Sequence, residues 1–184
     1  MIKPWTRLRS HRVHDYKILK VREDIVLDPR NQTEHARVVI ESSDWVNVVA
    51  LTRENKIILI RQFRTGTASE CLEVPGGIIE AGESPDHAAA RELEEETGYR
   101  SNNLSSLGSC HPNPAIQNNR CYTFLATECT KVSDGQPDDG EDIEVELRSS
   151  PEVFQLIREG KITHALALNA LLSYAFFVPS KRSG

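Results

Sequence analysis

Hydrophobic and polar positions follow two different periods along the chain, and together they predict strands and helices in one mixed fold. Two nearly continuous apolar runs, residues 45–51 and 56–63, flank the polar stretch 52–55 and predict a hairpin of buried strands. Further strand-like runs occupy residues 71–74, 104–110, 121–128 and 143–147. Helical spacing of apolar residues is found at 84–98, 150–160 and 163–178. This order predicts an α/β/α sandwich built on a mixed β-sheet.

The first helical stretch carries clear start and stop signals. Ser84 offers an oxygen for free N–H groups, and Pro85 has the fixed φ that suits a first helical residue. Gly98 offers the left-handed conformation that ends many helices. The second helix has the same serine–proline start at Ser150, and we expect the third helix to begin at Thr163.

The first 41 residues predict a separate small sheet. Strand-like runs at 13–21, 25–27 and 37–41 are joined by turn-like residues, and such a meander is too small to be stable alone. We therefore expect residues 1–41 to form an N-terminal β appendage that packs on the main domain or on a partner subunit. Residues 42–184 are expected to form the main domain.

Charge is distributed unevenly along the chain. Residues 1–64 carry 13 Lys and Arg against 8 Asp and Glu, whereas the other 120 carry 9 against 19. The overall acidity, a net charge of −5, argues against a nucleic-acid polymer as partner. No run approaches the roughly 20 apolar residues of a membrane span, and the N-terminus lacks the apolar segment of a secretion signal. The four cysteines show no Cys-x-x-Cys spacing, so we expect reduced thiols in a cytoplasmic protein without a zinc site.

The first helical stretch also concentrates carboxylates. Glu92 and Glu96 lie four residues apart and therefore share one helix face, with Glu95 beside them. Like charges at this spacing destabilise a helix by roughly 0.2–0.5 kcal/mol per pair, and a hard cation such as Mg²⁺ would remove the repulsion. The alternative interpretation of these residues alone is a solvated acidic face. The spacing of these glutamates relative to the residues around them favours the metal site.

The segment fits the pattern G-x5-E-x7-R-E-U-x-E-E-x-G-U, in which U is bulky and apolar, and so resembles a complete Nudix box. The matching residues are Gly77, Glu83, Arg91, Glu92, Leu93, Glu95, Glu96, Gly98 and Tyr99. Tyr99 departs slightly from the pattern, because an aliphatic residue is usual there. The resemblance implies a loop–helix–loop that binds a divalent metal and a hydrolase that acts on a nucleoside diphosphate linked to another group.

The resemblance also implies roles for the box residues. Glu92 and Glu96 are expected to bind Mg²⁺ directly, with Mn²⁺ as a possible substitute, and Glu95 to bridge or to hold a second ion. The backbone carbonyl of Gly76, just before the box, is expected to join them. In the family, the arginine that matches Arg91 pairs with the glutamate that matches Glu83 and ties the loop to the helix. A plain surface ion pair is the alternative for Arg91 and Glu83.

Two later features resemble the ADP-ribose pyrophosphatase and nucleoside-diphosphate-sugar branch of this family. Pro114 follows the box by 15 residues, at the place of a proline that marks this branch, although its neighbours depart from the usual Ser-Pro-Gly. The acidic stretch 140–143 resembles a loop whose glutamate contacts metal and acts as, or beside, the general base. We expect Glu141 to be that base, because neighbouring carboxylates raise the pKa of a loop carboxylate. Asp139 and Glu144 are the alternatives.

Candidate substrate residues lie outside the box. Arg64 resembles the phosphate-binding arginine of the branch in its Gln-x-Arg context, and Arg37 resembles one that reaches a phosphate from the N-terminal strands. Tyr16, Trp5 and Trp45 are candidates for stacking on the nucleobase, although aromatic residues in strands are more often core. In this branch the N-terminal strands commonly swap across a homodimer, so we expect a homodimer and a possible stacking residue from the second subunit.

The sequence therefore predicts a Mg²⁺-dependent Nudix hydrolase that cleaves the pyrophosphate bond of a nucleoside diphosphate sugar. ADP-ribose is the expected substrate, with AMP and ribose 5-phosphate as products. GDP-mannose or another sugar nucleotide is the alternative within the branch. The alternative of another class is a non-hydrolysing ADP-ribose sensor, which the complete set of box glutamates disfavours.

Overall fold

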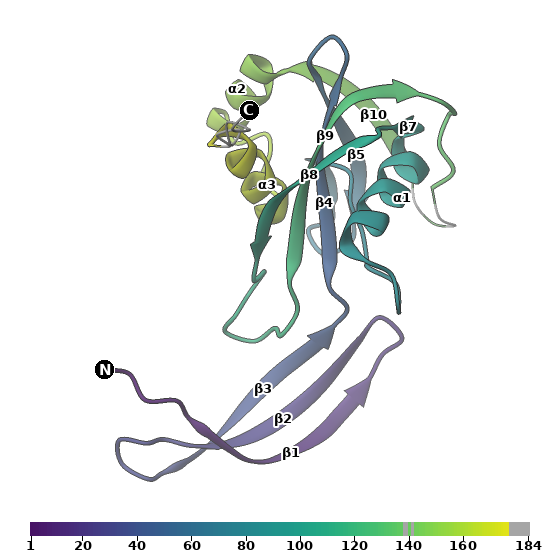
Figure 1. Ribbon diagram of the computed structural model, residues 1–184. Coiled ribbons are helices and arrows are strands. Elements are labelled where there is room, and N and C mark those ends of the chain that lie inside the picture. Colours follow the sequence, from purple (N-terminus) through teal and green to yellow (C-terminus); the bar gives the residue numbers. More distant parts are fainter. Residues whose placement is uncertain (138–139, 141, 177–184) are drawn as a thin grey trace, which may run out of the picture. The chain divides into compact units, whose positions relative to one another are not determined.

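The computed structural model describes residues 1–137, 140 and 142–176, and these divide into two units (Figure 1). The first unit combines residues 1–44 with the loop 111–120, and the second contains residues 45–110 and the chain from residue 121 onward. The two units are described one at a time below. The boundary between an appendage and a main domain at residues 41 and 42 stays a prediction.

The first unit is an antiparallel sheet of three strands, β1 (Thr6–Asp15), β2 (Leu19–Leu27) and β3 (Glu34–Ser42). The loop 111–120 adds to the β3 edge, where the Ile40 N–H donates to the Ile116 carbonyl at 2.7 Å. The expected boundaries were wrong in this unit. The first strand begins at Thr6, and residues 21 and 25 belong to one strand because the first turn lies at residues 16–18. Charged residues that alternate along these strands hid their true length.

The second unit is organised around a seven-stranded mixed sheet. Its central strands are β5 (Lys56–Arg64), β4 (Trp45–Thr52) and β9 (Cys121–Lys131), and β4 runs parallel to β9. The other pairings are antiparallel, with β10 (Ile143–Ser149) and β6 (Ser69–Glu73) on β5. On the other side of the sheet, β8 (Asn103–Cys110) and β7 (Tyr99–Arg100) pair with β9. The two apolar runs predicted to form buried strands are confirmed as β4 and β5.

Helices cover both faces of this sheet, which confirms the predicted α/β/α sandwich (Figure 1). On one face, α1 (Pro85–Thr97) packs Ala89 and Leu93 against alternate residues of β4 and β9. On the other face, α2 (Ser150–Arg158) and α3 (Ala165–Ala175) pack against the remaining residues of β4 and β5. Because β4 is buried on both faces, its side chains alternate between the two clusters.

The helix caps differ from the predicted ones in detail. Ser84 is the N-cap of α1, but its side chain makes no capping hydrogen bond. The second helix is capped by Ser149 instead of Ser150, and the Ser149 N–H donates to the Glu152 carboxylate at 2.7 Å. The third helix is capped by His164 and not by Thr163. Each error is one residue, which is the usual uncertainty of a helix boundary.

A fork in the sheet positions the loop that precedes α1. Strand β5 pairs with β4 at only two positions, Ala50 with Ile58 and Leu51 with Ile57. Beyond these positions, β4 bonds to the loop after β6, where the Val46 N–H donates to the Gly77 carbonyl at 2.9 Å. Residues 75–77, called the glycine loop below, therefore bond to β4 in place of β5. The start of the box thus lies where β4 and β5 separate.

The described residues contain no helix that is both long and apolar enough to cross a membrane. All four cysteines are free thiols, and Cys71, Cys121 and Cys129 are buried, as predicted for packed and reduced side chains.

Gly98 ends α1 in the left-handed conformation that the sequence predicts, with φ at +72°. A Cβ atom at this position would lie 2.1 Å from the Ser133 carbonyl oxygen, so the following loop closes over the helix end. We predict that Gly98→Ala lowers the free energy of unfolding by more than about 2 kcal/mol, because the conformational cost of a left-handed alanine, about 1–2 kcal/mol, adds to this clash.

Gly82→Ala is the matched control for this change, measured by urea unfolding. Gly82 also has a positive φ, at +86°, but nothing lies within 4 Å of a Cβ built there. Gly82→Ala should lower the free energy of unfolding only by the conformational cost of a left-handed alanine. Equal decreases in the free energy of unfolding of the two variants would show that the contact between the helix end and the loop does not contribute to stability.

Candidate active site

A cavity of about 590 Å³ lies in the second unit at the fork of the sheet. Its lining comes from the start of β4, the end of β5, the end of β6 with the loop that follows it, one face of α1 and the start of α3. The ionisable side chains in the lining are Arg64, Glu73, Glu80, Arg91, Glu92, Glu95, Glu96 and His164. The three box glutamates expected to bind metal therefore reach one cavity.

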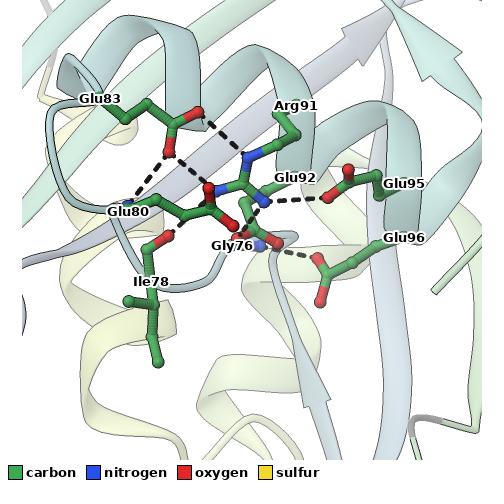
Figure 2. Close-up of polar contacts among 8 residues, drawn as sticks. All are labelled: Gly76, Ile78, Glu80, Glu83, Arg91, Glu92, Glu95 and Glu96. Carbon is green, nitrogen blue, oxygen red and sulfur yellow. Dashed lines mark hydrogen bonds and ion pairs between the residues drawn. The ribbon is translucent and has the colours of Figure 1, made fainter. Parts of the chain in front are cut away.

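Arg91 is the centre of the polar contacts on the α1 side, and Figure 2 shows its guanidinium between Glu83 and the helix carboxylates. Two parallel bonds join it to Glu83, from Nε at 3.1 Å and from Nη2 at 3.0 Å. Its Nη1 donates to both Glu92 and Glu95, each at 2.9 Å. Nη2 also donates to the carbonyl of Ile78 at 3.0 Å. One cation thereby links the glycine loop, the start of the helix and its acidic face.

These contacts stabilise the charged forms of both Arg91 and Glu83. The bonds to Glu83, followed by those to Glu95 and Glu92, raise the pKa of Arg91 despite its partial burial. The Arg91 guanidinium lowers the pKa of Glu83, and the Glu80 N–H, 3.2 Å from its carboxylate, acts in the same direction. Glu83 is therefore a carboxylate held by donors, and its role is to fix the loop next to the helix.

Two box carboxylates are fixed against the glycine loop. The Gly76 N–H donates to Oε2 of Glu96 at 2.8 Å, and Glu96 is only 4% exposed. The carboxylate of Glu92 packs on Gly77, where an added Cβ would lie 2.4–2.6 Å from its atoms. A larger residue at this position would displace the carboxylate of Glu92. The box glycine is thus needed for the close approach of the carboxylate.

The donor chemistry of this face fits a hard divalent cation, because Glu92, Glu95 and Glu96 offer only oxygen to one cavity. Within the described residues, however, no three His, Cys, Asp or Glu side chains are grouped closely enough to form a metal centre. Arg91 instead occupies part of the carboxylate capacity of Glu92 and Glu95. The residues therefore suit Mg²⁺ by type, and their role as its ligands stays a prediction.

A second polar group in the cavity is centred on Glu73, whose side chain is 3% exposed. Arg64 binds this carboxylate through Nε at 2.9 Å and Nη2 at 3.0 Å, and Nδ1 of His164 lies 3.1 Å from Oε2. Burial opposes ionisation of Glu73, but His164 and Arg64 outweigh it and lower its pKa to about 2. Arg64, expected from the sequence to bind phosphate, is therefore positioned at the cavity by a buried carboxylate.

Of the other predicted substrate residues, Trp45 lines this cavity, whereas Arg37, Tyr16, Trp5 and Pro114 lie in the first unit. Arg37 lies over the ring of Trp5, 5.4 Å from its centroid, and Tyr16 contacts the ring of His14 at 4.2 Å. Pro114 belongs to the loop 111–120, which adds to the edge of β3. Their contact with substrate stays a prediction.

The expected general base and one alternative fall outside the described residues. These are Glu141 and Asp139. Glu144, the other alternative, is an exposed residue of β10 opposite Arg61 of β5. The identity of the base stays a prediction.

The polar cavity residues to which the sequence reasoning assigned no role include Asn47, Glu73 and His164. Asn47 is the one amide in the apolar run of β4, and this break in the pattern was a usable signal. Glu73 and His164 gave no such signal, since they are 91 residues apart and only the packing of α3 near β6 brings them together.

Comparison with known proteins agrees with this fold. The chain matches the NUDIX domain over residues 43–168. It is 31% identical to the ADP-ribose pyrophosphatase of Bacillus subtilis over 81% of this chain and 80% of that protein. It is 34% identical to the ADP-sugar pyrophosphatase of Mus musculus over 72% of this chain and 68% of that protein. A methanol dehydrogenase activator of Bacillus methanolicus is 30% identical over 84% of each chain.

A solved structure described as an ADP compounds hydrolase has the same fold. Its TM-score is 0.84, with 23% identity, and the match covers 95% of this chain and 94% of that one. The mixed sheet, the glycine loop and the carboxylate-bearing helix define a hydrolase of the Nudix type. The chain belongs to the Nudix family, which confirms the family, the enzyme class and the fold predicted from the sequence.

The low pKa of Glu73 gives a pH-dependent prediction. Its pKa in the folded protein, about 2, lies below the ordinary value of 4.5, so its ionised form stabilises the fold above about pH 4.5. This contribution is lost as the pH falls from 4.5 toward 2. We predict that Glu73→Gln lowers the free energy of unfolding by about 3 kcal/mol at pH 7 and by clearly less at pH 3.5.

Glu70→Gln, on the same strand, is the control for denaturant unfolding at both pH values. Glu70 has a side chain 71% exposed and only a 3.9 Å contact with Arg61, so its loss should be below about 1 kcal/mol at either pH. If Glu73→Gln lowers the free energy of unfolding by the same amount at pH 7 and pH 3.5, the assignment of an ionised Glu73 is contradicted.

Proposed function

We propose that this Nudix hydrolase cleaves the pyrophosphate bond of a nucleoside diphosphate sugar, with ADP-ribose as the leading substrate. Water adds to one phosphorus atom and the bridging P–O bond breaks, so that ADP-ribose gives AMP and ribose 5-phosphate. Each product carries one of the two phosphates. The observation that carries the proposal is the cavity in which Glu92, Glu95 and Glu96 meet Arg64 and His164.

The distribution of charge in this cavity suits a diphosphate. Phosphate oxygens need cationic or neutral donors, and Arg64 lies at the cavity in a fixed orientation because Glu73 holds two of its nitrogens. The acidic side weakens the binding of a diphosphate, and a divalent cation would remove this effect. Carboxylates for the cation and a fixed arginine for the phosphate thus occur in one cavity.

The residues proposed to hold Mg²⁺, or Mn²⁺ in its place, are Glu92, Glu95 and Glu96, with the carbonyl of Gly76. When bound, such a cation neutralises phosphate charge and makes water a better nucleophile. Arg91 and Glu83 do not react in this proposal. They hold the helix face and the glycine loop in register, so that carboxylates and the Gly76 backbone stay together.

The choice of ADP-ribose rests on similarity to other proteins. Relatives named ADP-ribose pyrophosphatase occur in Bacillus subtilis, Saccharomyces cerevisiae and Haemophilus influenzae, and the mouse relative is named ADP-sugar pyrophosphatase. Their names support a substrate with an ADP moiety and a sugar on the second phosphate. GDP-mannose and other sugar nucleotides are the alternatives within this chemistry.

A homodimer remains part of the proposal. The sheet of the first unit leaves large apolar side chains exposed, including Leu8, Val13, Ile18 and Val38. A second copy of the chain would cover such residues, and it would give the aromatic residues Trp5 and Tyr16 a role near the nucleobase. Sedimentation of the purified chain tests this proposal, because a monomer at assay concentration contradicts it.

The substrate proposal is tested with one purified sample and a panel of compounds in Mg²⁺. The panel contains ADP-ribose, GDP-mannose, UDP-glucose and diadenosine polyphosphates, and the products are separated and identified. The proposal expects the highest kcat/KM with ADP-ribose and equal amounts of AMP and ribose 5-phosphate. Hydrolysis of diadenosine polyphosphates alone would overturn it, and binding of ADP-ribose without turnover would favour a sensor.

We predict that Glu92→Gln and Glu96→Gln each lower kcat by about 100-fold or more at saturating Mg²⁺. A divalent ion contributes several kcal/mol to such reactions, and glutamine lacks the charge that binds it. The fold should persist, because the glutamine oxygen can still accept the bonds now made by Arg91 and the Gly76 N–H.

Glu94→Gln is the matched control on the same helix. Glu94 pairs with Arg100 at 2.7 Å and does not belong to the cavity lining, so this variant should keep near wild-type kcat. Circular dichroism and thermal unfolding check that all three variants fold. Full activity in both Glu92→Gln and Glu96→Gln would remove these residues from the metal site.

A further inference from the structure

Asn47 has an unusual position in the cavity. The residue is 8% exposed, it belongs to the cavity lining, and its Nδ2 has no hydrogen-bond partner among the described residues. An amide nitrogen can donate two hydrogen bonds, and a buried donor without an acceptor costs free energy. A protein tolerates such a group at a site where a ligand supplies the missing acceptor.

The fold itself does not require an amide at this position. Asn47 lies within an apolar run of β4, and strand alternation places it on the same face as Val49 and Leu51. Those two residues pack in the cluster that includes α3. An apolar side chain of similar volume would continue that cluster. The amide is therefore an exception to the core pattern that has a cavity beside it.

The surroundings of Asn47 show which ligand group it would meet. The N–H groups on either side, of Val46 and Val48, donate to the carbonyls of Gly77 and Pro75, so the strand is fixed beside the glycine loop. The amide packs on Gly76, where an added Cβ would lie 2.7 Å from its Oδ1. Gly76 in turn donates to the Glu96 carboxylate. Asn47 thus lies next to the carboxylates proposed to hold the cation, yet on the α3 face of β4.

A ligand at this point has to offer hydrogen-bond acceptors. Nδ2 is only a donor, and Arg64 on the same cavity is also only a donor. A non-bridging phosphate oxygen carries charge and accepts several hydrogen bonds without needing to donate one. A sugar hydroxyl would satisfy Nδ2 as well, but it leaves its own proton to be accepted. The chemistry of the site therefore favours phosphate.

We propose that Asn47 donates a hydrogen bond from Nδ2 to a non-bridging oxygen of the diphosphate and so binds it independently of the metal. This inference rests on the proposed function for the identity of the substrate as a diphosphate. Asn47 is a binding residue in this account and takes no proton. Its contribution should be present in the absence of any divalent ion.

The test is calorimetric titration of ADP into the full chain in EDTA, where the metal cannot contribute. Asn47→Leu removes the donor and keeps the branched shape and the number of heavy atoms of the side chain. We expect its affinity for ADP to fall about tenfold, as for a hydrogen bond to a charged acceptor. Its thermal stability should stay the same or rise, because a buried donor without a partner has been replaced by an apolar group.

Gln62→Met is the matched control. Gln62 is 7% exposed and its Nε2 also lacks a partner among the described residues, but it is absent from the cavity lining. It should show the same direction of stability change and unchanged affinity for ADP. This comparison separates a ligand-binding amide from an amide that is merely buried.

Unchanged affinity in Asn47→Leu would overturn the inference, and so would a wild-type chain that binds no ADP at millimolar concentration in EDTA. A large loss of stability in Asn47→Leu, absent in Gln62→Met, would show a structural role and overturn it too. Failure of the proposed function has a different signature. In that case ADP-ribose is not hydrolysed with Mg²⁺, although binding of ADP in EDTA still depends on Asn47.

Discussion

The site depends on one arginine between carboxylates. Glu92, Glu95 and Glu96 lie on one face of α1, where their charges repel one another, and Arg91 on the same helix supplies the compensating cation. Because Arg91 also holds Glu83 through two parallel bonds, the same contact closes the loop that precedes the helix. Lysine cannot replace this planar arrangement of donors.

The backbone of the glycine loop also fixes the carboxylates of α1. The fork leaves part of the β5-facing edge of β4 without a strand partner, and the loop after β6 takes that position. Gly76 then donates to Glu96, and the absence of a side chain on Gly77 admits the carboxylate of Glu92. Sheet pairing therefore controls how close the loop comes to the helix. The acidic face of α1 is then bonded to the loop backbone through the Gly76 N–H.

The cavity combines two opposite electrostatic arrangements. On the α1 side, several carboxylates share the guanidinium of Arg91. Around Glu73, two nitrogen-containing side chains share a single buried carboxylate, which keeps that carboxylate ionised to about pH 2. Asn47 adds a neutral donor without an acceptor among the described residues. These contrasting environments lie in one cavity.

The sequence by itself determined the elements whose signals are local. Apolar runs identified β4 and β5, the serine–proline start and Gly98 bounded α1, and residue spacing along that helix identified the family and the carboxylate face. Local signals were weaker in the N-terminal strands, where charged residues alternate with apolar ones, and the strand boundaries were wrong there.

Only the tertiary structure decided which distant residues share the cavity. Glu73 and His164 come together because α3 begins next to the end of β6, and no local pattern encodes that contact. Asn47 interrupts the apolar pattern of β4, but only the sheet fork shows that it lies beside Gly76. Periodicity reports which face of an element is buried, whereas the meeting of side chains from different elements depends on how the whole sheet pairs and packs.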